Sequence, residues 1–216
     1  MKKLTSIVTL LYCLNAFSDT PSENYKQLSK SDPINITQQR ALTTPYPLYE
    51  YIYLRPDLAG LLAKEFGNSI YEVTMITESN YVIKSSEMEA NVHILNIEDN
   101  KHDSSIRYYI EGHVNPLYIK IAFEMNLDIS ATNNHPGVSY NVNIETLPKR
   151  RWLSWLVRIL DGHVGRNLEM ITNSVDDTAM MIETKPLEVI EKLDQLFKTN
   201  QIKTNDYYFL RGIMTY

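Results

Sequence analysis

Residues 117–129 read LYIKIAFEMNLDI, and an apolar side chain stands at every odd position of this stretch. The even positions hold Tyr, Lys, Ala, Glu, Asn and Asp. Such strict alternation is typical of a strand with one buried face and one face in water. A strand of this length would span about 44 Å, twice the usual strand length. The stretch therefore predicts either a strand broken by a bulge or an unusually long, curved sheet, and we favour the second.

The residues on both sides of this ribbon continue the same period. After a loop of turn-forming residues at 130–137, residues 138–144 alternate between apolar and polar side chains. Two adjacent runs of this kind predict an antiparallel hairpin. Further strands are predicted over residues 70–77, 81–85, 88–94 and 107–114.

Helical patterns flank the predicted sheet. Residues 56–66 begin with a proline suited to a first turn and precede Gly67, which suits a C-cap. Residues 152–160 repeat apolar side chains at helical spacing, and a last helix begins at Pro186. Short strands are predicted at 168–172 and 179–184, a tight turn at the adjacent Asp176 and Asp177, and a docked tail at 203–216. The fold class is therefore α+β: a long antiparallel meander sheet with helices packed on one face, in a single domain over residues 45–216.

The N-terminus has the pattern of a secretory signal peptide. Lys2 and Lys3 precede an apolar run that ends in small residues near position 18, and the run is too short to span a bilayer. We therefore predict a signal peptide at 1–18 and an exported protein, periplasmic or extracellular. The polar stretch 19–44 is predicted to be a flexible lead. Because the single cysteine, Cys13, lies in the signal, the mature chain would have no thiol chemistry or disulfides.

Composition and motifs exclude several classes of function. The 216 residues carry a formal charge of −5, and removing Lys2 and Lys3 leaves 19 basic against 26 acidic residues. Nucleic-acid binding needs clustered basic residues, so no nucleic-acid partner is predicted. The sequence has no H-E-x-x-H, G-x-S-x-G, P-loop or G-x-G-x-x-G motif, so we predict no enzyme and no cofactor. His93 and His113 could share a metal from neighbouring strands, but exposed sheet histidines are the simpler interpretation.

The helix predicted at 152–160 carries the candidate ligand site. Basic residues stand at its start, and two tryptophans lie on its apolar face. That face either packs on the sheet or makes peripheral contact with a membrane. If it closes over a groove, the basic residues would attract an anionic head group. The candidate ligand-binding residues are Lys149, Arg150, Arg151, Trp152, Trp155 and Leu156.

The aromatic stretch 46–53, YPLYEYIY, also has two interpretations. It is either a surface patch that recognises a partner or a segment packed against the body of the domain. Tyrosine packs well with its hydroxyl outward, so packing is favoured.

The order of elements resembles that of the tubular lipid-binding (BPI/SMP-like) envelope proteins. The likeness rests on a signal, a short helix, a meander containing PLYIKIAFEMNLDIS and VSYNVNIETLP, and a following amphipathic helix. It spans roughly residues 50–198 and includes no diagnostic motif, and the chain lacks the lipid-attachment cysteine of many such proteins. The resemblance implies a curved sheet that leaves an apolar channel for acyl chains.

Two classes of function are consistent with these patterns. The first is an exported, non-enzymatic binding protein with an apolar groove for lipid or another hydrophobic small molecule. The second is a protein-interaction module of the cell envelope or surface (a structural component, adhesin or inhibitor) that binds an envelope protein partner through a sheet edge or through residues 46–53.

Overall fold

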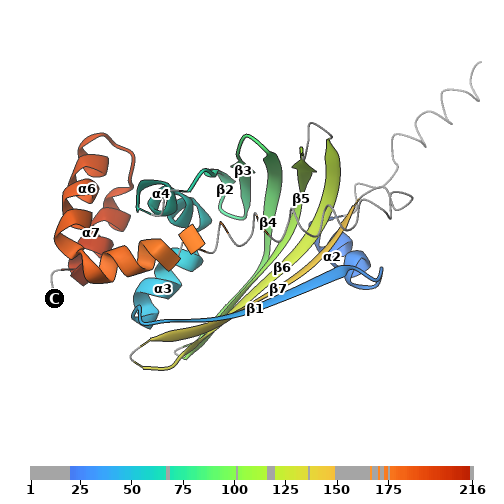
Figure 1. Cartoon of the computed structure of the whole chain (residues 1–216), viewed down its shortest axis with the longest axis horizontal. Coiled ribbons are helices and arrows are strands. Elements are labelled where there is room, and N and C mark those ends of the chain that lie inside the picture. Colours follow the sequence, from blue (N-terminus) through green and yellow to red (C-terminus); the bar gives the residue numbers. More distant parts are fainter. Residues whose placement is uncertain are drawn as a thin grey trace, which may run out of the picture.

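The strands form one antiparallel, seven-stranded sheet in the order β1-β7-β6-β5-β4-β3-β2. This computed structural model describes residues 20–66, 69–100, 102–115, 120–135, 137–148, 166, 170, 173–174 and 176–214. Figure 1 shows long, curved strands with α3, α4, α6 and α7 gathered at one end and α2 near the other. The strands are β1 (Ile34–Leu42), β2 (Glu72–Thr77), β3 (Asn80–Lys84), β4 (Met88–Asp99), β5 (Asp103–Val114), β6 (Ile121–Asn133) and β7 (Val138–Pro148). The helices are α2 (Pro21–Ser29), α3 (Tyr46–Tyr53), α4 (Pro56–Phe66), α6 (Pro186–Lys198) and α7 (Thr204–Met214).

The alternating ribbon predicted from residues 117–129 forms the centre of the sheet. β6 pairs without interruption with β5 from Ile121 to Thr132 and with β7 from Phe123 to Asn133, so the long, curved strand is confirmed for its described residues. Phe123, Met125 and Ala131 are buried, whereas Ala122 and Ser130 are exposed. We call the face that carries the odd-numbered side chains of β6 the inner face, and the opposite face the outer face. Four of the predicted meander strands, those of 70–77, 81–85, 88–94 and 107–114, are also confirmed with shifted ends.

The prediction of a flexible lead over 19–44 is wrong for the described residues. Thr20 caps α2 through a capping box with Glu23, which satisfies free amides at the helix start. Residues 34–42 form β1, which pairs with β7 over nine residue pairs from Ile34–Thr146 to Leu42–Val138. β1 is a largely polar edge strand, so it has little apolar signal of its own. Its partner β7 lies about a hundred residues away in the chain, so no neighbouring segment indicates the pairing either.

α2 packs on the outer face of the sheet. The Asn126 amide donates to the Tyr25 carbonyl at 3.0 Å, and the Tyr25 hydroxyl donates to Asp128 at 2.7 Å. Because Asn126 and Asp128 are even-numbered residues of β6, they point away from the inner face. Asn126 is only 1% exposed, so α2 shields from solvent a polar patch of the sheet that would otherwise face water.

α3 and α4 pack on the inner face and separate two apolar cores. The aromatic stretch 46–53 is α3, with Tyr46 and Tyr49 buried against the sheet, which confirms the packing interpretation. Its other side places Leu48 and Ile52 in a second core. That second core also contains residues of α4, α6 and α7, so the C-terminal helices stack on α3 and α4 rather than on the sheet (Figure 1). The predicted α+β class and antiparallel meander are thus confirmed, with α3 and α4 on the inner face and α2 as the exception on the outer face.

The short strand predicted at 179–184 is wrong, because residues 176–184 are helical. Ile182 enters the second core, which explains why a helix forms there. The turn predicted at Asp176 and Asp177 is wrong for the same reason. Asp176 instead accepts hydrogen bonds from Arg40 at 2.8 Å and from the Tyr140 hydroxyl at 2.7 Å, and so ties this helix to β1 and β7. Of the strand predicted at 168–172 only Met170 is described, and it is helical.

A partly buried ion pair joins α7 to the turn between α3 and α4. The two terminal nitrogens of Arg55 each lie 3.0 Å from one carboxylate oxygen of Asp206. The Tyr51 hydroxyl also donates to Asp206 at 2.7 Å. Asp206 is 3% exposed, so this carboxylate depends on its partners for the charge stabilisation that water would otherwise provide.

Candidate functional site

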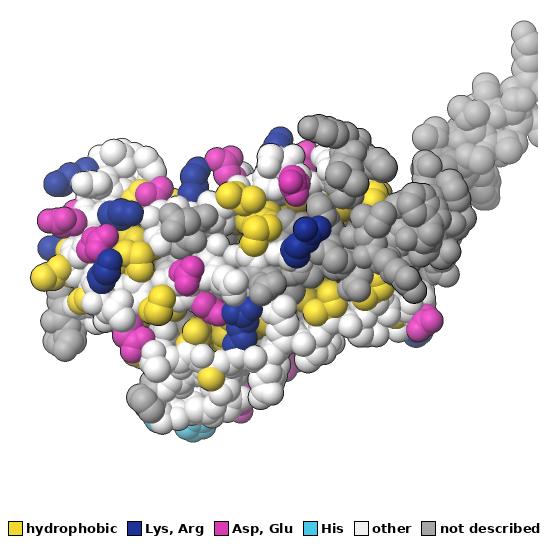
Figure 2. All heavy atoms as spheres, viewed as in Figure 1, with side chains coloured by type: hydrophobic (Ala, Val, Ile, Leu, Met, Phe, Trp, Pro, Cys, Tyr) yellow, Lys and Arg dark blue, Asp and Glu magenta, His cyan; other side chains and the backbone are white. Residues whose placement is uncertain are grey.

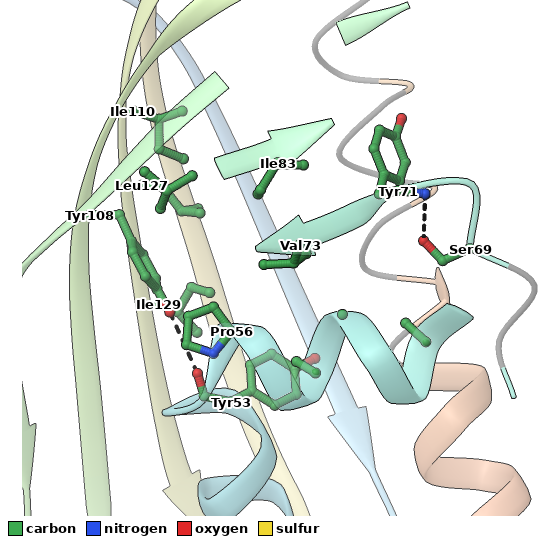
Figure 3. Close-up of a pocket in the computed structure, with 14 residues that line it drawn as sticks. Tyr53, Pro56, Ser69, Tyr71, Val73, Ile83, Tyr108, Ile110, Leu127 and Ile129 are labelled. Carbon is green, nitrogen blue, oxygen red and sulfur yellow. Dashed lines mark hydrogen bonds between the residues drawn. The ribbon is translucent and has the colours of Figure 1, made fainter. Parts of the chain in front are cut away.

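A cavity of about 140 Å³ lies between α4 and the inner face of the sheet. Figure 3 shows α4 on one side of it and strands on the other, with Val73, Ile83, Ile110 and Leu127 pointing toward one another. The lining residues are Tyr53, Pro56, Ala59, Gly60, Ala63, Ser69, Tyr71, Val73, Ile83, Val92, Tyr108, Ile110, Leu127 and Ile129.

Small residues on one side of α4 leave the space for this cavity. Pro56, Ala59, Gly60 and Ala63 recur at helical spacing along the cavity wall, while Leu62 and Phe66 enter the second core. A Cβ atom on Gly60 would lie 2.4 Å from a methyl carbon of Val73, so glycine is needed for α4 to approach β2 this closely. The cavity thus arises because one helix face is bulky and the other is small.

Two polar groups interrupt the apolar wall. The Tyr108 hydroxyl donates to the main-chain carbonyl of Tyr53 over 3.5 Å, beside Pro56 (Figure 3). The backbone amide of Tyr71 donates to the Ser69 hydroxyl over 3.2 Å. None of the described lining residues has a charged side chain.

The tyrosines at the cavity keep their protons over the whole physiological range. Burial raises the pKa of Tyr108 well above its ordinary value. Burial, together with the nearby Glu87 charge, raises the pKa of Tyr71 to about 12. The Tyr108 hydroxyl is therefore a permanent hydrogen-bond donor and is not poised to act as a general base.

The pKa of a carboxyl group in α3 is also shifted from its ordinary value. Burial raises the pKa of Glu50 in α3 from 4.5 to about 7, and the Asp99 carboxyl beside it adds to the effect. The folded chain therefore holds a proton on Glu50 that the unfolded chain releases between these two values.

Replacing Glu50 with Gln is expected to stabilise the protein above pH 7 by about 1 kcal/mol, allowing for partial solvent screening. The folded wild-type chain loses stability as pH rises from 4.5 to about 7, because Glu50 must then be ionised in a partly buried place. The amide stays neutral, so the difference between variant and wild type should vanish near pH 4.5. Urea unfolding at pH 4.5, 6 and 8 measures it.

Glu72→Gln is the matched control for this titration. Its hydrogen bond with Lys64 lowers the pKa of Glu72, so removing this charge should not stabilise the protein at any pH. A Glu50→Gln difference that is the same at pH 4.5 and pH 8 would contradict the assigned cause.

The predicted ligand-binding residues Lys149, Arg150, Arg151, Trp152, Trp155 and Leu156 lie outside the described residues. The same holds for the predicted signal peptide at 1–18. Both assignments stay predictions, and the cavity is built from other residues.

The structure does not bring His93 and His113 together. In the ladder between β4 and β5, His93 stands opposite Tyr109 and His113 stands opposite Glu89. Nδ1 of His93 lies 2.6 Å from the Asn80 side-chain oxygen, which gives it a structural partner. Within the described ranges, no three His, Cys, Asp or Glu side chains gather as metal ligands would.

Sequence reasoning missed the residues that form the cavity. The available signal was the run of small side chains at 56, 59, 60 and 63, opposite the bulky ones that define the apolar face of the helix. A second signal was the tyrosine at 108 inside a predicted strand. Neither identifies a cavity until the pairing of distant strands places β2 to β6 beneath α4.

None of the helices in the described part of the chain combines the length and hydropathy needed to cross a bilayer. No protein-family model and no curated protein matches the chain.

Several solved structures share the fold. A conserved protein from Geobacillus kaustophilus is 11% identical, with a TM-score of 0.52 over 69% of this chain and 97% of that chain. A hypothetical protein from Helicobacter pylori is 5% identical, with a TM-score of 0.51 over 71% and 93%. An uncharacterized protein from Rhizobium leguminosarum is 8% identical, with a TM-score of 0.50 over 69% and 95%. These neighbours give no support to the tubular lipid-binding resemblance. At such identities they show the fold alone.

Proposed function

We propose that this chain is a non-enzymatic binding protein that holds a hydrophobic small molecule in the cavity between α4 and the inner face of the sheet. The observation that carries the proposal is the lining, in which aliphatic side chains of α4 and five strands surround an uncharged space. Apolar lining with a few directed polar groups is typical of small-molecule sites.

Export to the periplasm or extracellular space is part of this proposal. It rests on the signal-peptide pattern of residues 1–18 alone. Secretion of the full chain, followed by N-terminal sequencing of the product, tests it: a product that retains Lys2 and Lys3 would refute cleavage.

Replacing Ile129 with Trp is expected to weaken ligand binding at least about tenfold, equivalent to about 1.4 kcal/mol. Ile129 lines the cavity from β6, so the larger indole would occupy the space a ligand needs. Binding is measured by calorimetry with ethylbenzene and by fluorescence with a twelve-carbon fluorescent fatty acid. Native mass spectrometry of the gently purified wild type reports any molecule that co-purifies.

Thr132→Trp is the matched control, because Thr132 is an exposed, even-numbered residue of the same strand. It should bind as wild type does. If Ile129→Trp fails to fold, Ala59→Leu narrows the same cavity from the α4 side. Binding that survives in a folded variant of either kind would remove the cavity from the site.

A second candidate function, a protein-interaction module, is favoured by the edge strand β2. Ile76 is 63% exposed and Met75 is 39% exposed on this strand, which pairs with β3 on one side only. Exposed apolar residues on a sheet edge can pair with another chain. In contrast, charged side chains of both signs are interspersed over the helical end of the face in Figure 2. An empty cavity together with a stable complex with an envelope protein, lost in Ile76→Lys, would favour this candidate.

A further inference from the structure

The size, charge and polar groups of the cavity restrict the ligand beyond its being hydrophobic. A cavity of about 150 Å³ with aliphatic walls holds a single benzene ring. The cavity beneath α4, at about 140 Å³, is of this size. A long acyl chain is larger than one ring and would have to extend out of it.

The cavity wall also disfavours a charged ligand. No described lining residue carries a charged side chain, and the tyrosine hydroxyls remain protonated. A carboxylate placed there would lose its hydration without gaining an ionic partner, which is strongly unfavourable. An uncharged molecule avoids this penalty.

Among the described lining residues, Tyr108 supplies the directed polar contact on the sheet side. Its hydroxyl is buried, with the residue 5% exposed, and its hydrogen bond to the Tyr53 carbonyl is 3.5 Å long. Hydroxyl donors normally lie 2.5–3.0 Å from their acceptors, at a mode of about 2.7 Å, so this bond is weak. A ligand hydroxyl beside the pair, about 2.8 Å from each oxygen, could accept from Tyr108 and donate to the Tyr53 carbonyl.

We infer that the cavity selects an uncharged, ring-sized molecule that bears a hydroxyl group, held by the Tyr108 hydroxyl and the Tyr53 carbonyl. This inference rests on the proposed function and specifies its ligand class. It gives Tyr108 the role of a specificity-determining residue.

Two isosteric probes test the hydroxyl contact in the full chain. Benzyl alcohol and ethylbenzene have the same number of heavy atoms and differ in one terminal hydroxyl or methyl group. Tyr108→Phe keeps the ring and removes the hydroxyl. It is expected to raise the dissociation constant of benzyl alcohol about three- to tenfold, the usual range for one hydrogen bond. The dissociation constant of ethylbenzene should stay within about twofold of the wild-type value. Dissociation constants come from NMR titration.

Tyr109→Phe is the matched control. Tyr109 is the next residue of β5 and stands opposite Asn126, so it lies on the outer face beneath α2. It should change neither dissociation constant. Benzoate and the twelve-carbon fluorescent fatty acid complete the set, because they test charge and length.

The outcomes separate this inference from the proposed function. We expect Tyr108→Phe to weaken the binding of benzyl alcohol but not of ethylbenzene. We also expect the wild type to bind benzoate at least tenfold more weakly than benzyl alcohol. Equal losses for both isosteres, or no loss, would overturn the hydroxyl contact while the binding function stands. Benzoate or the fatty acid binding more tightly than the neutral probes would overturn the ligand class only. If no probe binds to wild type, both proposals fail.

Discussion

Replacing Phe123 with Ala is expected to lower the free energy of unfolding by about 4 kcal/mol. Phe123 is an odd-numbered residue of β6 and is 1% exposed in the core on the inner face of the sheet. It stands opposite Gly112, which has no side chain to fill the space that the ring would leave. The loss therefore combines the transfer of apolar surface with an unfilled cavity. Urea unfolding at neutral pH measures it.

The matched control lies on the same strand. Ser130 is even-numbered and exposed on the outer face, so Ser130→Ala should change stability by no more than about 0.5 kcal/mol. Similar losses in the two variants would mean that β6 does not have one buried and one wet face, and the architecture proposed from its alternation would be wrong.

Replacing Arg55 with Ala is expected to lower the free energy of unfolding by about 3 kcal/mol. Asp206 would remain buried with the Tyr51 hydroxyl but without the guanidinium that binds both of its oxygens. An uncompensated buried carboxylate is far less stable than one in water. Because Arg55 precedes Pro56 in the cavity wall, the same change should also loosen the end of α4. Chemical unfolding gives the stability, and hydrogen exchange of α4 amides gives the local effect.

Two variants distinguish the buried pair from ordinary surface charge. Lys64→Ala removes an exposed pair with Glu72, whose side chains are 50% and 66% exposed, and should lower the stability far less than Arg55→Ala does. The double variant Arg55→Ala with Asp206→Ala should be more stable than Arg55→Ala, since it no longer buries an unpaired charge. A double variant less stable than both Arg55→Ala and Lys64→Ala would contradict this account.

The Arg55 prediction concerns the position of α3 and α4, which form a wall of the cavity and a wall of the second core. The Arg55–Asp206 pair joins the turn between these two helices to α7. The geometry of the cavity therefore depends on contacts made on the far side of both helices. Variants designed to test ligand binding should accordingly be checked for stability first.

Local patterns predicted most of the sheet and two of the helices well. The strands at 88–94, 107–114 and 138–144 alternate clearly because each has one face on the core, which requires an apolar side chain at every second position. The helices that begin at Pro56 and Pro186 carry a proline start and an apolar stripe. The docked tail is α7, whose Tyr207 and Leu210 enter the second core.

The misses share one physical cause. β1 and the helix at 176–184 take their conformation from partners distant in the chain: β1 pairs with β7, and Ile182 packs among residues of α3, α4 and α6. Tertiary contacts of this kind override a weak local preference. α2 was missed because its fixing contacts are polar ones to Asn126 and Asp128.

The order of apolar and polar side chains was enough to determine that a long, one-sided ribbon runs through the middle of this chain and that helices must cover it. That information is local, since side chains alternate with a fixed period along any strand. Only the tertiary structure decided that Gly60 sits against Val73, that Tyr108 reaches the carbonyl of Tyr53, and that a space remains between them. A cavity is the volume that packing leaves unfilled, and it depends on the relative positions of segments that no short stretch of sequence specifies.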